Sequence, residues 1–270
     1  MGRLAGKIVI VTGAGSSTGI GAAIARLAAL EGARLVLADI DVTGATGVAQ
    51  DIDAKIGDRV THPIALDLTD EHSIRAMVSA AQQRWGGLHA IVNNAADTSL
   101  TGRDGRIETM DVEIWDRTIA ANLRGTMLAC RHAIPALRAS GGGGAIVNIA
   151  SGAALRGGPA LSAYGVSKAG IVSLGQYVAA QHGAEGIRCN TISPSIIITP
   201  KTEAVFGGAD NWERLQIHML SPRLGATDDI GAAVLWLISD EGAYVNGQCI
   251  SIDGGQMSHQ NPLIDAVMPR

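Results

Sequence analysis

The run Lys7-Ile8-Val9-Ile10-Val11-Thr12-Gly13-Ala14-Gly15-Ser16-Ser17-Thr18-Gly19-Ile20-Gly21 leads from a short apolar segment into a glycine-rich loop. The apolar residues include many β-branched side chains, which favour a buried β-strand over 7–12. The residues after the loop predict a helix over 19–31. Glycines between a strand and a helix let the backbone approach a pyrophosphate, and the helix N-terminus supplies N–H donors. Tight turns also collect glycine, but the position between strand and helix favours a dinucleotide site.

The alternation of short apolar runs with longer amphipathic segments continues along the chain. The predicted strands are 7–12, 34–39, 60–66, 88–92, 144–149, 187–192 and 248–252, and the predicted helices are near 19–31, 43–55, 70–83, 111–138, 161–182 and 227–239. Strands that are apolar throughout are buried on both faces, so we expect a parallel sheet with helices on each side. The pattern predicts one doubly wound α/β domain over 1–256, whose ligands bind beyond the strand C-termini.

Three segments break this alternation, of which the first, Gly141 to Gly144, is most simply a flexible turn into the fifth strand. Residues 199–222 are too many for a tight connection and are predicted to cover the active site as a lid. The lid contains four large apolar residues, Phe206, Trp212, Met219 and Leu220. They would suit a hydrophobic substrate, although a lid that packs on the core would need the same residues. The tail 257–270 has no clear period, and it would either pack on a neighbouring subunit or be disordered.

The bulk composition bounds the class of protein. With 270 residues, of which 47% are hydrophobic and 17% charged, the chain can bury a substantial core. A formal net charge of −4 argues against nucleic acid or an anionic membrane as the main partner. No apolar stretch reaches the ~18 residues that span a bilayer, and no secretory signal precedes the glycine loop, so we expect a cytoplasmic location. The three cysteines and seven histidines lack metal-ligand spacing, and no metal site is predicted.

Tyr164 and Lys168 are four residues apart within the predicted helix 161–182, so they share one face of it. A phenol with a pKa of about 10 is a poor base at neutral pH, but a neighbouring lysine cation favours the phenolate and lowers that pKa. Ser151 follows the predicted strand 144–149 and could hydrogen-bond a substrate oxygen. Such a set suits the interconversion of an alcohol and a carbonyl. The Tyr-x-x-x-Lys spacing alone is weak, so the prediction depends on the dinucleotide site upstream.

Asp39 ends the second predicted strand, about twenty residues beyond the glycine loop. A carboxylate in that place accepts hydrogen bonds from the adenosine ribose hydroxyls and repels a 2′-phosphate. Asp41 adds to the repulsion, and the loop contains no arginine or lysine. The interpretation is NAD in preference to NADP, although Asp39 could instead cap a helix.

Together these residues resemble the short-chain dehydrogenase/reductase family over about residues 5–256. The family motifs occur in the expected order: the glycine loop, Asp67-Leu68, Asn93-Asn94-Ala95-Ala96, Asn122, Ser151, the Tyr164/Lys168 pair, Pro194 to Thr199, Asn246-Gly247-Gln248 and Asp253-Gly254-Gly255. Their joint occurrence is far more specific than any one of them. The resemblance implies a Rossmann-type fold and an enzyme that acts on CH–OH donors. It also implies a homotetramer or homodimer, built through the helices 111–138 and 161–182 and the last strand.

The resemblance implies roles for four side chains at the reaction centre. Tyr164 would act as the general acid/base, and Ser151 would hold the substrate oxygen. Lys168 would bind the nicotinamide ribose and lower the tyrosine pKa. Asn122 would support a water that links Lys168 to solvent as a proton relay.

The cofactor contacts that the resemblance implies lie beyond the strand C-termini. Asp67 would contact the adenine amine with Leu68 beside the ring, while Ile197 and Thr199 would contact the nicotinamide carboxamide. The other expected contacts are Gly13, Gly15, Ser17, Thr18, Gly19, Ile20, Asp39, Asn94, Ala95, Ala96, Tyr164, Lys168 and Pro194.

Three departures from the family pattern stand out. Gly13 and Gly19 are six residues apart, which makes the loop two residues longer than usual, so a hydroxyl between them would take over some phosphate contacts. Ala96 stands where the Asn-Asn-Ala motif normally ends in glycine. Ser195 replaces the glycine that usually follows Pro194. None of these changes removes a catalytic group.

The expected function is that of an NAD(H)-dependent oxidoreductase that interconverts a secondary alcohol and a ketone. One alternative uses the same Tyr-Lys pair on another bond, by C=C reduction, elimination or epimerisation. Another is a dinucleotide-sensing protein without turnover, although such proteins typically lose the tyrosine or the lysine. Substrate choice is expected to depend on residues 96–108, 153–161 and 199–222. The segment 96–108 contains Arg103 and Arg106, which would be compatible with a substrate that bears a carboxylate.

Overall fold

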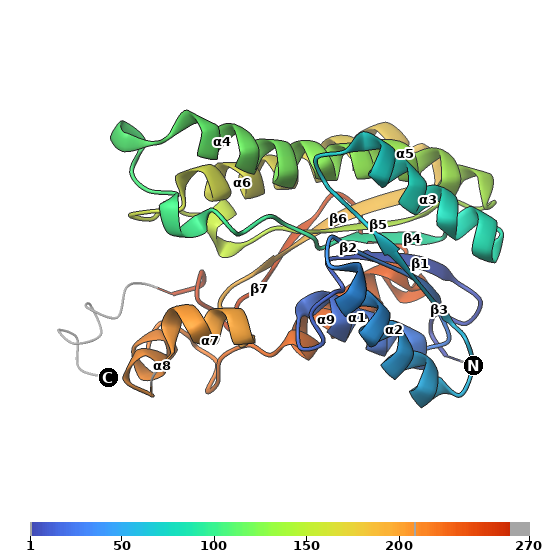
Figure 1. The fold of residues 1–270 in the computed structure, drawn as a ribbon, viewed down its shortest axis with the longest axis horizontal. Coiled ribbons are helices and arrows are strands. Elements are labelled where there is room, and N and C mark those ends of the chain that lie inside the picture. The colour runs from blue at the N-terminus through green and yellow to red at the C-terminus, as the bar shows by residue number, and fades with distance from the viewer. Residues whose placement is uncertain (1, 208, 260–270) are drawn as a thin grey trace.

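A parallel sheet runs through the middle of the molecule with helices on both faces (Figure 1). The computed structural model describes residues 2–207 and 209–259. In this part of the chain the strands lie in the order β3-β2-β1-β4-β5-β6-β7. They are β1 (Ile8–Thr12), β2 (Arg34–Asp39), β3 (Thr61–Ala65), β4 (Ala90–Asn93), β5 (Gly144–Ile149), β6 (Ile187–Pro194) and β7 (Cys249–Ile252). The predicted doubly wound sheet, in a single domain, is confirmed.

The helices form a layer on each face of the sheet, with α3 to α6 on one side and α1, α2 and α9 on the other (Figure 1). Their bounds are α1 (Ile20–Leu30), α2 (Val42–Ile56), α3 (Glu71–Trp85), α4 (Val112–Thr118), α5 (Gly125–Ala139), α6 (Ser162–His182) and α9 (Thr227–Ile238). Two shorter helices, α7 (Pro200–Phe206) and α8 (Ala209–Gln216), follow β6. The ends of the predicted elements agree with the structure to within two residues, the usual uncertainty of such boundaries.

The strands supply two separate cores, one on each face of the sheet. Val9 and Val11 of β1 belong to the core shared with α1 and α9, whereas Ile8 and Ile10 belong to the core shared with α3 and α5. Successive side chains of a strand point to opposite faces, so a strand covered on both sides must be apolar throughout. This is why every residue of β1 is buried.

The long helix predicted over 111–138 is one helical run with an interruption in its hydrogen-bond pattern. Residues Ile119–Arg124 form a π-helical segment between α4 and α5. The backbone stays helical on either side, with φ of −63° at Thr118 and −59° at Gly125. Such segments are rare and occur frequently at functional sites. This one contains Asn122.

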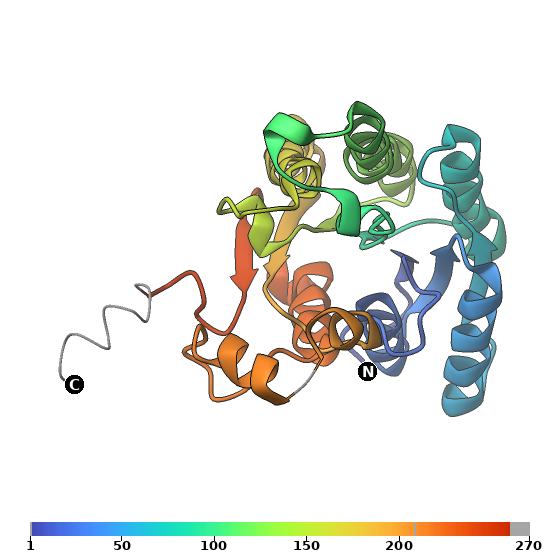
Figure 2. The same cartoon turned by 60° about the vertical axis from the view of Figure 1, so that its left-hand side comes forward.

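The predicted lid, residues 199–222, contains α7 and α8 instead of a plain loop. In Figure 2 these two helices (orange) lie on the opposite side of the sheet's carboxyl edge from α4 and α6. Thr199 caps the N-terminus of α7, because its hydroxyl accepts a hydrogen bond from the Thr202 N–H at 3.2 Å. The side chain of Phe206 and most of the predicted tail, residues 260–270, lie outside the described residues. Among the helices described, none combines the length and the apolar character that crossing a membrane requires.

The order of the strands reverses between β1 and β4. After β1 the chain continues to β2, and after β4 it continues to β5 on the other side. The loops that leave these neighbouring strands therefore separate and leave a crevice at the carboxyl edge. Asn94 ties the two loops together, since its Nδ2 donates to the carbonyl oxygens of Thr12 at 2.9 Å and Gly13 at 3.1 Å.

Helix α1 approaches the turn after β1 so closely that only glycine fits at Gly21. A Cβ there would lie 2.1 Å from the carbonyl oxygen of Gly13. In contrast, a Cβ on Gly47 of α2 would meet no atom within 4 Å. We therefore expect Gly21→Ala to lower the free energy of unfolding by about 1–3 kcal/mol, because the loop or helix must move.

The test is urea denaturation of Gly21→Ala beside Gly47→Ala, which inserts the same methyl group into an exposed helical position. Gly47→Ala should be neutral or should stabilise the protein by up to about 1 kcal/mol, since alanine favours helix. Equal midpoints for the two variants would show that the close approach at Gly21 is not needed.

Candidate active site

A cleft of about 520 Å³ lies at the carboxyl edge, where the crevice between β1 and β4 opens. It brings together residues from six separate parts of the chain. From the expected set its lining includes Gly13, Gly15, Ile20, Asp39, Asn94, Ala95, Ala96, Ser151, Tyr164, Lys168, Pro194, Ile197 and Thr199. The cleft therefore joins the glycine loop to the Tyr-Lys pair, as a dinucleotide with its reactive ring at one end would require.

A second cavity of about 710 Å³ continues from the cleft past Asp67 and Leu68. The residues that line both cavities are Gly13, Asp39, Ala95, Ala96, Thr98 and Lys201. Arg117 and Lys201, which the sequence did not single out, also line the second cavity. The Lys201 ammonium donates to the Thr98 hydroxyl, and Arg117 lies 3.4 Å from an Asp97 carboxylate oxygen. Helix α7 thus meets the loop after β4 across the cavity.

The longer glycine loop forms an extra turn. The Gly19 N–H donates to the Ser16 carbonyl at 2.9 Å, which closes the turn before α1 begins. Ser16 lines the cleft, whereas Ser17 and Thr18 are exposed and do not. The first turn of α1 has no side-chain cap at Gly19, so its N–H groups are available to a ligand.

Asp39 faces the glycine loop. Its Oδ2 accepts a hydrogen bond from the Gly15 N–H at 2.7 Å, and its Oδ1 accepts one from the Asp41 N–H at 2.9 Å. The helix cap is Asp41 instead, whose Oδ1 accepts from the Gly44 N–H at 2.9 Å. The alternative reading of Asp39 as a helix cap is therefore wrong, and its carboxylate lines both cavities.

Tyr164 and Lys168 lie one turn apart near the start of α6, with the Lys168 Nζ 5.7 Å from the centre of the tyrosine ring. Lys168 is almost completely buried, and its ammonium donates to the Ile149 carbonyl at 2.8 Å. Ser151 follows β5 two residues beyond that carbonyl. The end of β5 and the start of α6 thus hold the three expected side chains in one place.

Burial dominates the protonation of this pair. It lowers the pKa of Lys168 from its ordinary value of 10.5 to about 8. Burial also raises the pKa of Tyr164, while the hydrogen bond with the Ser151 side chain opposes that rise. The expected lowering of the tyrosine pKa is therefore not found in this structure, because the removal of the phenolate from water is the larger effect.

Asp104 holds the start of α6 from another part of the chain. Its Oδ1 accepts from the Ala163 N–H at 3.0 Å and its Oδ2 accepts from the Tyr164 N–H at 2.8 Å. The residue before the helix, Leu161, supplies no side-chain cap. Asp104 is buried, and it provides the capping oxygens that orient the helix turn carrying Tyr164. Sequence reasoning missed it because a cap normally precedes its helix directly.

Asn122 is fully buried in the π-helical segment. Its Oδ1 accepts from the Asp97 N–H at 2.7 Å, and its Nδ2 donates to the Asp97 carbonyl at 3.2 Å. These two bonds fix the loop after β4. Asn122 does not line the cleft, so its expected role in a proton relay stays a prediction.

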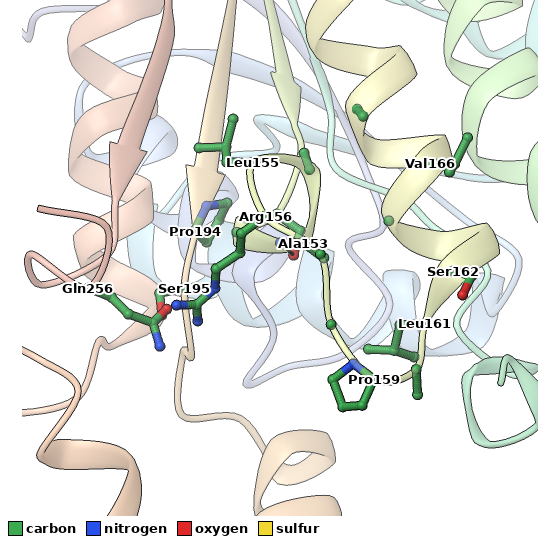
Figure 3. A pocket seen from close by; sticks show the side chains of 18 of the residues that line it. Ala153, Leu155, Arg156, Pro159, Leu161, Ser162, Val166, Pro194, Ser195 and Gln256 are labelled. Atoms are coloured by element: carbon green, nitrogen blue, oxygen red, sulfur yellow. Dashed lines mark hydrogen bonds between the residues drawn. The ribbon is translucent and has the colours of Figure 1, made fainter. Parts of the chain in front are cut away.

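A third cavity, of about 770 Å³, adjoins the cleft and shares Ser151, Pro194 and Ser195 with it (Figure 3). Its walls come from the segment 152–162, the first turns of α6 and the residues after β6. Ser195, the residue that replaces the usual glycine, donates its hydroxyl to Gln256 Oε1 at 2.6 Å. The serine at this position thus holds Gln256, which follows β7, at the wall of the cavity.

Neither arginine singled out in the segment 96–108 lines this cavity. Arg103 lies 3.4 Å from an Asp111 carboxylate oxygen, and Arg106 lies 2.8 Å from one of Glu108. The large apolar residues of the lid are also absent from its described lining.

Comparison with known proteins places this architecture in a family. A family model described as enoyl-(acyl carrier protein) reductase matches residues 13–257. A protein of Bradyrhizobium diazoefficiens, named as a probable short-chain type dehydrogenase/reductase, is 42% identical over 259 residues, which cover 96% of this chain and 90% of the relative. D-threitol dehydrogenase of Mycolicibacterium smegmatis is 38% identical over 254 residues, with 94% of each chain covered.

A solved structure agrees with these sequence relatives. The crystal structure of levodione reductase superposes with a TM-score of 0.88 and 31% identity, covering 95% of this chain and all of the other. With the glycine loop, the strand order and the Tyr-Lys pair of α6 in place, the chain belongs to the short-chain dehydrogenase/reductase family.

Proposed function

We propose that this protein is an NAD(H)-dependent oxidoreductase that interconverts a secondary alcohol and a ketone, with Tyr164 as the general acid/base. The observation that carries the proposal is the meeting of Ser151, Tyr164 and Lys168 in the cleft, which adjoins the third cavity at Ser151. The names of two relatives, D-threitol dehydrogenase and levodione reductase, support chemistry between alcohols and carbonyls.

The residues of the cleft fit a dinucleotide. Gly13 has a φ of +72°, and a Cβ there would lie 2.9 Å from the Ala95 backbone, so the turn has room only for glycine. The uncapped N–H groups of α1 suit a pyrophosphate, and the Asp39 carboxylate suits ribose hydroxyls. When bound, the nicotinamide accepts a hydride from the alcohol carbon or returns one to the ketone carbon.

The side chains then handle the substrate oxygen and its proton. Ser151 and Tyr164 hold the oxygen through their hydroxyl groups. Because its pKa is raised, Tyr164 must first lose its own proton before its phenolate can take the alcohol proton, as the C–H bond breaks and the C=O bond forms during oxidation. During reduction the phenol gives its proton to the ketone oxygen. Lys168, with its pKa lowered to about 8, can lose and regain a proton near neutral pH and favours the phenolate when charged.

A second candidate is reduction of a C=C bond, since the matching family model is described as an enoyl reductase. Product analysis separates the two reactions, because carbonyl reduction yields an alcohol and leaves a C=C bond intact, whereas enoyl reduction saturates the C=C bond and leaves the carbonyl. A dinucleotide-sensing protein without turnover would not need a tyrosine with a buried phenol group and a buried lysine one turn apart on α6, as Tyr164 and Lys168 are.

We propose assembly into a homotetramer or homodimer through α4 to α6 and β7, for which the exposed side chain of Tyr177 on α6 offers apolar surface. We also propose a cytoplasmic location and a substrate with a hydrophobic part.

The first test removes the phenol oxygen. Tyr164→Phe should lower kcat about 10²- to 10⁴-fold, the usual contribution of general acid–base catalysis, and leave NADH affinity nearly unchanged. Turnover is followed by NADH absorbance and affinity by NADH fluorescence. Tyr177→Phe, on the exposed side of the same helix, is the control and should behave as wild type. Near-normal turnover of Tyr164→Phe would disprove the role.

The second test concerns cofactor choice. Asp39→Ala should narrow the preference for NAD over NADP about tenfold or more, since the carboxylate no longer binds the ribose or repels the 2′-phosphate. The measurement is kcat/KM for each cofactor, with Asp51→Ala on the exposed face of α2 as the control. An unchanged ratio in Asp39→Ala would mean that Asp39 does not contact the ribose.

The third test concerns the positioning of Tyr164 by Asp104. Asp104→Ala removes both oxygens that cap α6, so kcat should fall while NADH affinity stays, and stability should drop by about 0.5–2 kcal/mol. Asp104→Asn keeps one acceptor oxygen and should restore part of kcat. If both variants retain wild-type kcat, Asp104 has no part in orienting Tyr164.

A further inference from the structure

The third cavity, which adjoins Ser151, contains one charged side chain among its described lining residues, that of Arg156. The other lining residues are apolar or neutral, and no aspartate or glutamate occurs among them. Within residues 2–207 and 209–259, Arg156 has no ion pair, in contrast to Arg103 and Arg106. The exposed side chain of Arg156 is the one charge on this otherwise neutral described wall, so an anion is favoured there over a cation.

Gln256 adds hydrogen-bond donors to the same wall. Its Oε1 accepts the hydroxyl of Ser195, so its amide nitrogen is left with two N–H groups to donate. Figure 3 shows the Arg156 side chain extending toward Ser195 and Gln256. The guanidinium and the amide nitrogen offer donors only, which is the chemistry that binds an oxyanion.

We propose that the substrate carries a carboxylate and that Arg156 and Gln256 bind it. This inference rests on the proposed function, because the reacting oxygen of the same molecule lies between Ser151 and Tyr164. A carboxylate matches the planar fork of a guanidinium and brings one negative charge to one cation. A phosphate would bring a second charge that no other side chain in the described lining offsets.

The walls between the two ends accept the hydrocarbon part of such a substrate. Leu155, Pro159, Val166 and Ile196 line the cavity with apolar surface. Ser151 and Pro194 connect the cavity to the cofactor cleft, so an alcohol carbon there can meet the nicotinamide while the acid group reaches Arg156. The substrate class is therefore a secondary hydroxy acid, or the oxo acid formed from it, with an apolar chain or ring.

The first experiment compares hydroxy acids with their methyl esters, which keep the same body and lose the charge. A panel of hydroxyalkanoates and hydroxycycloalkanecarboxylates is assayed with NAD. Wild type should favour the best acid over its ester by about 10- to 100-fold in kcat/KM, the effect of one charged hydrogen-bond pair. Arg156→Gln should lose this preference and keep its activity on the ester. Arg106→Gln removes the same charge outside the cavity and should behave as wild type.

The second experiment needs no turnover. Isothermal titration of the NADH-containing protein with cyclohexanecarboxylate should give binding that Arg156→Gln weakens at least tenfold, whereas cyclohexanecarboxamide should bind both proteins weakly and alike. Oxidation of neutral alcohols without preference for any acid, or carboxylate binding that Arg156→Gln leaves unchanged, would overturn the carboxylate site and leave the proposed function standing. Absence of all alcohol oxidation, with carboxylate binding retained, would overturn the proposed function instead.

Discussion

The rest of the site depends on the hydrogen bonds between Asn94 and the end of β1. The strand order reverses here, so the loops after β1 and β4 have no sheet to keep them together. Asn94 joins them through the carbonyls of Thr12 and Gly13, and Thr12 Oγ1 accepts the N–H groups of Asn94 and Ala95 at 3.0 Å. Because this side chain fixes the width of the crevice, the glycine loop and the loop after β4 form two walls of one cleft.

The other half of the site depends on contacts between β5, α6 and the segment that contains Asp104. The Ile149 carbonyl holds the Lys168 ammonium, and Asp104 holds the N–H groups at the start of α6. A helix N-terminus buried without partners would be costly, so the cap stabilises the fold and orients Tyr164 at the same time. The hydrogen bonds of Asp104 therefore both stabilise α6 and position the catalytic side chain of Tyr164.

The sequence predicted the features that depend on local pattern. Strands buried on both faces must be apolar, and a turn with positive φ at Gly13 requires glycine, so β1 and its loop could be read directly. Asp104 with Tyr164, and Ser195 with Gln256, are pairs separated by about sixty residues, and no local pattern indicates them. The rise in the pKa of Tyr164 could not be predicted from the sequence either, because the direction of the shift depends on how deeply the phenol is buried.

In the proposed reaction a secondary alcohol passes its hydride to the cofactor while Tyr164 moves the proton. The most direct measurement uses secondary alcohols that carry deuterium on the carbinol carbon, with mass spectrometry of the NADH and of the product. Direct hydride transfer should place one deuterium in the nicotinamide ring for each ketone formed. Deuterium found in the solvent or retained in a product of elimination or epimerisation would contradict it.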